Sequence, residues 1–313
     1  MITIDVLLSE NQIADELVAA LANRNLPEKF FYWFPTSVRA WISLCSDGAY
    51  RNFMRSQTLL QNYAAELVAH LPRGDVEVIS LGAGQGVKDL LVLEQLRAAG
   101  RTPHYVPVDA SQALLEMACE LATKSGFSCR GVKADLANAE HLAQLPHDRS
   151  GPPRLVMILG NTLGAFDPID YGARLARLLR PQDHLLIDGE IFSAEATMSG
   201  YDNPLNRRFA FAPLRSIGLE EPRDGALEFT SDTDSRRSGL HRVRKHFRAA
   251  RDLELLIAGE TIRLQVGQQI EMNWSYKYAR EAFLALLQEA GISPAAQHLS
   301  DDGRFLMVLG RRP

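Results

Sequence analysis

The sequence places small or acidic residues directly after four apolar runs, where ligand-binding groups stand in open α/β sheets. The first is a glycine loop, in which Gly82, Gly84 and Gly86 follow the run Ile79-Ser-Leu81 and precede a helical segment. Glycine lets the backbone turn tightly and approach a ligand closely. Because Val87 stands where the dinucleotide fingerprint has its last glycine, this loop alone does not identify the ligand.

Acidic residues follow the second and third runs. Asp109 comes after Tyr105–Val108, where a carboxylate is placed to accept hydrogen bonds from both ribose hydroxyls of an adenosine cofactor. NAD and S-adenosylmethionine share that ribose, so Asp109 does not choose between them. Asp135 is placed to accept from the adenine amino group, while the backbone amide of Leu136 faces a ring nitrogen. The alternative interpretation of each aspartate is a helix N-cap.

The fourth run, Leu155–Leu159, leads into Gly160, Asn161 and a loop that contains Ala165 and Phe166-Asp-Pro168. Small and amide-bearing residues there line the crevice in which ligands bind, although an ordinary loop would also have this composition.

Alternating elements must position these residues. Apolar runs alternate with amphipathic helices between residues 76 and 190, which is typical of a parallel sheet with crossover helices. The predicted helices are 87–99, 111–123 with Ser111 as N-cap, and 279–290, while residues 1–57 look mainly helical. Two terminal strands bring the count to seven, which favours a class I methyltransferase sheet over a six-stranded dinucleotide fold. The predicted strands are 76–81, 104–108, 128–133, 155–159, 184–188, 296–299 and 304–309.

Length and composition exclude several classes of protein. The 313 residues predict about two domains, and the net charge of −4 gives no general attraction to nucleic acid. Three cysteines without a CxxC pair, Cys45, Cys119 and Cys129, fit neither a disulfide framework nor a zinc site, so we expect no metal. No apolar run approaches the ~18 residues of a membrane span, and the N-terminus lacks a charged signal region. A soluble, cytoplasmic protein is expected.

The ordered motifs resemble one family, the histidine-specific S-adenosylmethionine methyltransferases of the ergothioneine pathway. The resemblance spans most of the chain. It is carried by Leu26-Pro-Glu-Lys-Phe-Phe-Tyr32, Leu81-Gly-x-Gly84 with Lys88, Tyr105-Val-Pro-Val-Asp109, Leu159-Gly-x-Thr-Leu-Gly164 with Phe166-Asp-Pro168, Tyr201-Asp202, and Gly259-Glu260 followed by Ser275-x-Lys277-Tyr278.

The resemblance implies a discontinuous architecture and a set of site residues. A methyltransferase core is expected over 58–191 and 281–313, and an α+β substrate-binding domain over 1–57 and 192–280. S-adenosylmethionine is the implied cofactor, with Lys88 suited to its carboxylate. The expected cofactor-binding residues are Gly82, Gly84, Gly86, Lys88, Asp109, Asp135, Leu136 and Gly160. Tyr32 and Tyr201 are the expected catalytic residues, and the expected substrate-binding residues are Tyr50, Asn161, Ala165, Glu190, Asn273 and Ser275.

Two of these positions depart from the family pattern. Ala165 stands where members that recognise histidine hold the amino-acid end with asparagine, and Asn273 stands where they place a glutamate against the imidazole. A methyl group accepts no hydrogen bond, and an amide offers no charge to an imidazole. Loss of built polar recognition costs ~10⁴-fold in specificity. The sequence therefore predicts an N-methyltransferase whose acceptor is a small amino-acid-like or other nitrogen-containing metabolite rather than histidine.

Alternatives to this interpretation remain open at this point. A guanidinium acceptor would need carboxylates, for which Glu190 and Glu271 are candidates. A nicotinamide-dependent oxidoreductase would use the same type of fold, and the arginines of 236–251 could contact nucleic acid, although alternation there favours one solvated strand face. We expect a small-molecule substrate, no nucleic acid and no membrane partner. The oligomeric state is not indicated.

Overall fold

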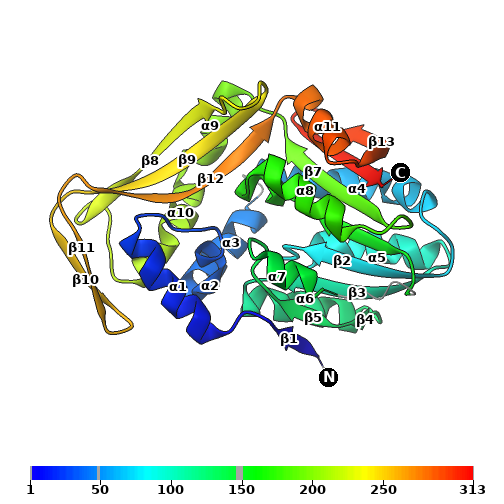
Figure 1. Cartoon of the computed structure of the whole chain (residues 1–313), viewed down its shortest axis with the longest axis horizontal. Coiled ribbons are helices and arrows are strands. Elements are labelled where there is room, and N and C mark those ends of the chain that lie inside the picture. Colours follow the sequence, from blue (N-terminus) through cyan, green and yellow to red (C-terminus); the bar gives the residue numbers. More distant parts are fainter. Residues whose placement is uncertain (1, 48–49, 146–150, 313) are drawn as a thin grey trace.

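The computed structural model describes residues 2–47, 50–145 and 151–312. Figure 1 shows two parts side by side: a large sheet with helices on both faces, and a smaller antiparallel sheet with its own helices. The described residues include no helix that is long and apolar enough to cross a membrane.

The described residues form a nine-stranded sheet in the order β1-β5-β3-β2-β6-β7-β14-β13, with β4 beside β3. β14 pairs antiparallel with β7 and with β13, and the other pairs are parallel. The order reverses at β2, which is the switch point where open α/β sheets bind ligands. The strands are β1 (Ile4–Val6), β2 (Asp75–Leu81), β3 (Thr102–Asp109), β4 (Ser128–Cys129), β5 (Gly131–Lys133), β6 (Arg154–Ile158), β7 (His184–Glu190), β13 (Ser293–Leu299) and β14 (Phe305–Arg311).

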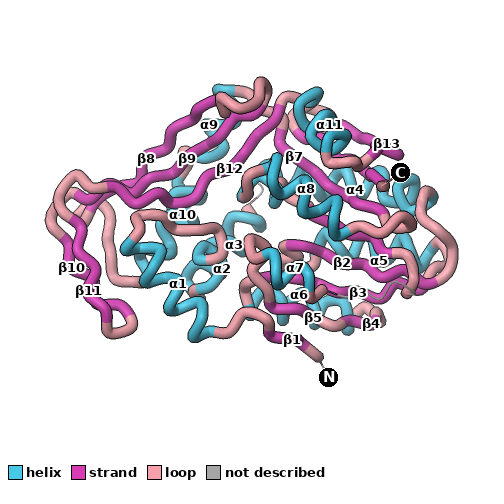
Figure 2. The backbone as a smooth tube through the Cα atoms, in the orientation of Figure 1, coloured by secondary structure: helices cyan, strands magenta, loops and turns pink. Residues whose placement is uncertain are grey.

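Helices cover both faces of this sheet (Figure 2), which explains why β6 and β7 are buried along their whole length. One face carries α4 (Arg51–Ala69), α5 (Val87–Ala98) and α6 (Gln112–Lys124), and the other carries α7 (Ala139–Ala143), α8 (Pro168–Leu178) and α11 (Arg280–Glu289). Ser111 caps α6 by accepting a hydrogen bond from the Leu114 amide, as the sequence predicted.

The smaller part has an apolar core of its own, to which Leu17, Phe209 and Phe247 contribute. Its antiparallel sheet has the order β12-β9-β8, and a hairpin of β10 and β11 extends from it. The division of the chain at the boundaries predicted from the sequence stays a prediction. The elements are α1 (Glu10–Ala22), α2 (Phe30–Trp33), α3 (Pro35–Ser46), α9 (Ala194–Tyr201), α10 (Pro204–Ser216), β8 (Gly225–Thr233), β9 (Leu240–Ala249), β10 (Leu253–Ile257), β11 (Glu260–Leu264) and β12 (Gln269–Tyr278).

Two strands differ from the sequence prediction. The strand predicted at 128–133 is divided into β4 and β5, and β1 adds to the sheet a strand from the segment expected to be mainly helical. Gly131 explains the second difference, because a Cβ there would lie 3.1 Å from Ile4 Cγ1 and 2.9 Å from Cys119 Sγ. The missing side chain lets β1 pair with β5 in parallel, with Ile4 opposite Gly131. The proposed boundary at residue 57 also falls inside α4.

Candidate active site

A cavity of about 410 Å³ lies at the carboxyl ends of β2, β3, β5 and β6, and is closed by residues of the smaller part. This volume is within the range of small-molecule sites. Of the predicted site residues, all except Gly86 and Glu190 line it. The topology therefore brings together residues that are up to about 240 positions apart in the sequence. Those that line it are Tyr32, Tyr50, Gly82, Gly84, Lys88, Asp109, Asp135, Leu136, Gly160, Asn161, Ala165, Tyr201, Asn273 and Ser275.

Asp109 is at the end of β3, where the glycine loop passes over it. Its Oδ2 accepts a hydrogen bond from the Gly84 amide at 2.9 Å, and its Oδ1 accepts from the Ser111 amide at 2.9 Å. The carboxyl group is buried, and burial raises its pKa to about 6 although the amides of Ser111 and Gly84 oppose that shift. The carboxylate keeps acceptor capacity for a further donor, such as a ribose hydroxyl.

Asp135 lies against a residue that the sequence analysis did not identify. Lys29, just before α2, places its Nζ 2.6 Å from Asp135 Oδ2 and also pairs with Glu16 of α1. Oδ1 of Asp135 accepts from the Ala137 amide at 2.8 Å. Lys29 therefore joins the smaller part to the rim of the predicted adenine site, and a bound adenine amino group would share Asp135 with it. The motif Leu26-Pro-Glu-Lys is the sequence feature that could have identified Lys29, because it holds two charged residues beside an aromatic run.

Lys88 lies near a buried carboxylate. A Cβ on Gly160 would stand 2.5 Å from Lys88 Nζ, so the missing side chain gives the ammonium its room. Asp188 of β7 is fully buried and accepts from the Asn161 amide at 2.8 Å and from Ser56 Oγ at 2.5 Å. Burial raises the pKa of Asp188, and Lys88 opposes that shift. This geometry fits a cation directed at an anionic group of the cofactor.

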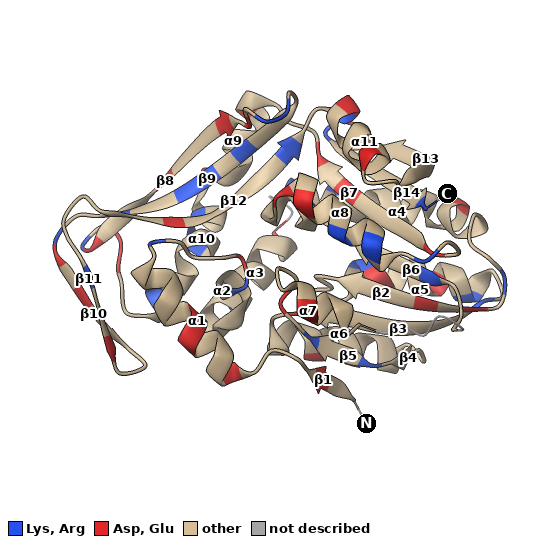
Figure 3. Cartoon of the chain, in the orientation of Figure 1, with Lys and Arg blue, Asp and Glu red and all other residues tan. Residues whose placement is uncertain are grey.

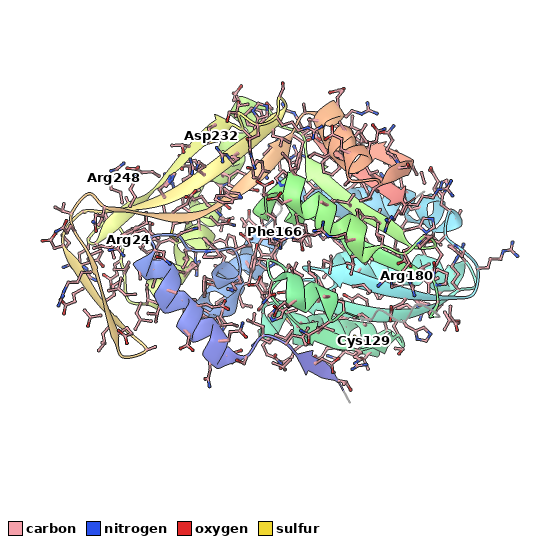
Figure 4. The ribbon with its side chains drawn as sticks, in the orientation of Figure 1. Arg24, Cys129, Phe166, Arg180, Asp232 and Arg248 are labelled. Atoms are coloured by element: carbon pink, nitrogen blue, oxygen red, sulfur yellow. The ribbon has the colours of Figure 1, made fainter. Side chains whose placement is uncertain are left out.

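Aromatic rings form the wall from the smaller part. The centroid of Trp41 lies 5.2 Å from that of Tyr32, 5.5 Å from that of Tyr50 and 5.3 Å from that of Phe209. Burial raises the pKa of Tyr32, of Tyr50 and of Tyr201 above the ordinary tyrosine value. The three hydroxyls therefore stay protonated at neutral pH, and can orient a ligand without acting as strong bases. Phe166 of the loop before α8 also lines the cavity and lies between the two parts (Figure 4).

A network of hydrogen bonds surrounds the hydroxyl of Ser275. Asn161, which precedes the short 3₁₀ helix η1 (Thr162–Ala165), donates through Nδ2 to the Tyr276 carbonyl at 3.2 Å and to Ser275 Oγ at 3.3 Å. Lys277 donates to Ser275 Oγ at 2.8 Å, and Tyr201 hydrogen-bonds to Ser275. The network fixes Ser275 and Tyr201 at the cavity surface.

Glu190 and Gly86 lie outside the cavity lining, unlike the other predicted site residues. The carboxylate of Glu190 is buried, lies 3.0 Å from Lys277 Nζ, and accepts hydrogen bonds from Asn52 and Thr197. Its carboxylate is linked to Ser275 through Lys277, and its backbone amide is linked to Ser275 through Asn161. Gly86 is the N-cap residue directly before α5, and a Cβ on it would stand 3.1 Å from the Ala118 Cα, so its small size serves helix packing. Glu271 pairs with Arg244 at 2.9 Å and does not line the cavity.

Position 273 holds an asparagine, but the carboxylate of Glu28, from a segment that is distant in the sequence, lies beside it. Asn273 has the left-handed φ of 66° within β12, and its Nδ2 donates to Glu28 Oε2. Glu28 also hydrogen-bonds to Tyr32, and burial raises its pKa. Glu28 lines the cavity, whereas Ala165 offers it only a methyl group. Glu28 belongs to the motif Leu26-Pro-Glu-Lys-Phe-Phe-Tyr32, but it does not stand at a strand end and so was not predicted as a site residue.

Comparison with known proteins identifies the family. A profile of the histidine-specific, S-adenosylmethionine-dependent methyltransferases matches residues 10–312. The chain belongs to this family. The histidine N-alpha-methyltransferase of Mycolicibacterium smegmatis is 27% identical over 81% of this chain and 80% of its own length. The N-methyltransferase imqF of Aspergillus flavus is 24% identical over 93% of this chain and 82% of its own length. A solved structure, the Burkholderia thailandensis 1,6-didemethyltoxoflavin-N1-methyltransferase, is 16% identical over 88% of this chain and 87% of that chain, with a TM-score of 0.46.

The family assignment confirms the main predictions from the sequence. The fold is that of the class I methyltransferases, the cofactor is S-adenosylmethionine, and the enzyme class is an S-adenosylmethionine-dependent N-methyltransferase. The oxidoreductase alternative is thereby set aside. The individual roles of the cavity residues stay predictions.

Asp109 predicts how cofactor binding by this methyltransferase depends on pH. In the proposed binding mode the ionised carboxylate would accept the ribose hydroxyls, and its pKa in the free protein is about 6. Binding should therefore weaken as pH falls through 6, with Kd for S-adenosylhomocysteine rising about tenfold between pH 7 and pH 5. Isothermal titration across this range measures the effect. Asp109→Asn cannot titrate, so its Kd should change less over the same range; parallel curves for the two proteins would contradict the assignment.

Proposed function

We propose that this enzyme methylates a nitrogen of a small amino-acid-like or other nitrogen-containing metabolite, and that histidine is not its substrate. The cavity carries the proposal, because its two sides differ in chemistry. Residues at the strand ends, such as Asp109 and Lys88, suit the cofactor, whereas Tyr32, Tyr201 and Ser275 come from the smaller part and suit an acceptor. Relatives named as N-methyltransferases support nitrogen as the accepting atom.

Methyl transfer from a sulfonium is an in-line displacement whose leaving group becomes neutral. Alignment of donor and acceptor ~3 Å apart supplies ~7–11 kcal/mol of the barrier. The tyrosine hydroxyls orient the lone pair of the amine, and the proton passes to water or to a modest base. An α-amine of pKa ~7.8, as at a peptide N-terminus, is neutral in roughly one molecule of seven at pH 7, whereas the more basic α-amine of a free amino acid must first give its proton to water or to such a base. Glu28, which holds Tyr32, is a carboxyl group within the same wall.

A guanidinium acceptor is less well matched to the cavity. Such a group has a pKa above ~12 and must be aimed and partly deprotonated by carboxylates. Glu190 and Glu271, the two acids that the sequence suggested for this task, are engaged with Lys277 and Arg244 outside the cavity lining. An amine is therefore the better-supported acceptor.

The arginine-rich segment 236–251 is matched by acidic neighbours. Arg242 pairs with Asp232 at 2.7 Å, and Arg248 pairs with Glu228 at 2.7 Å. Figure 3 shows red and blue positions intermixed over β8 and β9, and Figure 4 places Asp232 and Arg248 on these outer strands. Paired arginines give little attraction to phosphates, which supports a small-molecule substrate over a nucleic acid.

A screen of amino acids and amines with S-adenosylmethionine, read by mass spectrometry, tests the proposal. At least one amine should gain 14 mass units for each methyl group transferred, with S-adenosylhomocysteine formed in equal amount. Absence of S-adenosylmethionine binding by isothermal titration would contradict the cofactor assignment. Transfer to oxygen or carbon acceptors, with none to nitrogen, would contradict the acceptor class.

A further inference from the structure

One lysine of β9 faces inward. Lys245 stands between Val243 and Phe247, which are both 0% exposed, while its neighbours Arg244 and Arg248 bear the ion pairs of the other strand face. Side chains alternate between the two faces of a strand, so this register places Lys245 on the core side. Lys245 is 6% exposed and lines the cavity.

The ammonium of Lys245 lacks a hydrogen-bond acceptor among the residues that the structure describes. Its Nζ lies 4.6 Å from the centroid of the Phe31 ring and is attracted to the charge of Glu28. The Oε2 atom of Glu28 accepts from Asn273 instead. A lysine ammonium has three donors, and burial of an ammonium without an acceptor is unfavourable. A ligand group in the cavity would provide the missing acceptor.

We propose that Lys245 binds a carboxylate of the methyl acceptor, so that the substrate class is amino acids or related amino carboxylates rather than simple amines. This inference rests on the proposed function. Amide and hydroxyl groups would accept a hydrogen bond but would leave the ammonium with only the charge of Glu28, whereas a carboxylate supplies both charge and acceptor oxygens. Burial lowers the pKa of Lys245, and Lys277 adds to that shift. A bound carboxylate would restore the charged form.

The surrounding wall indicates the rest of the acceptor. Phe31 also packs against Phe209, with ring centroids 6.0 Å apart, and Phe209 belongs to the aromatic wall with Tyr32 and Trp41. These rings favour a flat apolar body beside the carboxylate site. Aromatic amino acids are therefore suitable first probes.

Isothermal titration into the complex with S-adenosylhomocysteine tests the inference. The probes are matched pairs that differ in the carboxylate: phenylalanine and phenethylamine, tyrosine and tyramine, tryptophan and tryptamine, histidine and histamine. At least one carboxylated member should bind about 10- to 100-fold more tightly than its amine. Lys245→Met should abolish this preference, and Lys245→Arg should retain part of it. Arg248→Met, on the outer face of the same strand, is the matched control and should leave the preference unchanged.

Each result decides one question. No preference for any carboxylate in the wild type, or a preference that survives in folded Lys245→Met, overturns the inference. Lys245→Met should melt at the same temperature as the wild type or higher, because a buried unpaired charge is replaced by an apolar chain of similar length. Loss of folding in this variant would show a structural lysine and also overturn the inference. Failure of the wild type to bind S-adenosylhomocysteine would instead contradict the proposed function.

Discussion

Histidine should be methylated with a kcat/KM about 10³- to 10⁴-fold below that of the best acceptor found by the screen. The side chain of Ala165 lines the cavity but has no polar atom to hold histidine, and the side-chain amide of Asn273 already donates to Glu28. The nearby ammonium of Lys245 also disfavours a cationic imidazole. Steady-state kinetics with histidine and with the preferred acceptor measure the ratio. Conversion of histidine at a comparable rate would contradict the prediction.

A variant that restores the family pattern provides the control for this prediction. Ala165→Asn combined with Asn273→Glu should raise the kcat/KM for histidine by at least about tenfold, because a hydrogen-bond acceptor returns at position 165 and a carboxylate stands at position 273 itself. Glu28→Gln should be added to remove the like charge beside the new glutamate. An unchanged rate with histidine in this folded triple variant would show that other positions exclude it.

Asp109→Ala should raise the Kd for S-adenosylmethionine about 30- to 150-fold, which corresponds to ~2–3 kcal/mol for a charge-assisted pair of hydrogen bonds. The carboxylate lies at the end of β3 and keeps lone pairs free for the ribose. Isothermal titration measures the change.

Two further variants separate binding from folding. Asp109 also accepts from the amides of Gly84 and Ser111, so its removal disturbs the loop as well. Asp109→Asn has the same shape and keeps one acceptor oxygen, and should retain more affinity than alanine. Asp75→Ala, at the exposed start of β2, is the matched control and should bind as the wild type does. An unchanged Kd in folded Asp109→Ala would refute the assignment.

Local patterns were sufficient to predict most of the parallel core. The run 184–188 corresponds to β7, and the helix predicted over 279–290 is α11, because long buried strands and amphipathic helices have distinct periods. β1 was not predicted, since three residues carry too little pattern and pair only because Gly131 leaves room. Fourteen of the site residues predicted from motifs line the cavity. Lys29 and Glu28 also line it but were not predicted, since neither stands at a strand end.

The sequence by itself determined the sheet, its glycine loop and the positions of Asp109 and Lys88, because each depends on neighbours along the chain. The tertiary structure decided which charges reach the cavity. Glu190 pairs with Lys277 outside the cavity lining. Glu28 accepts a hydrogen bond from Asn273 and lines the cavity, and Lys245 of β9 also lines it. These positions depend on contacts between segments far apart in the chain. Burial and the pairing of each charged side chain decide which charges are available to a bound substrate.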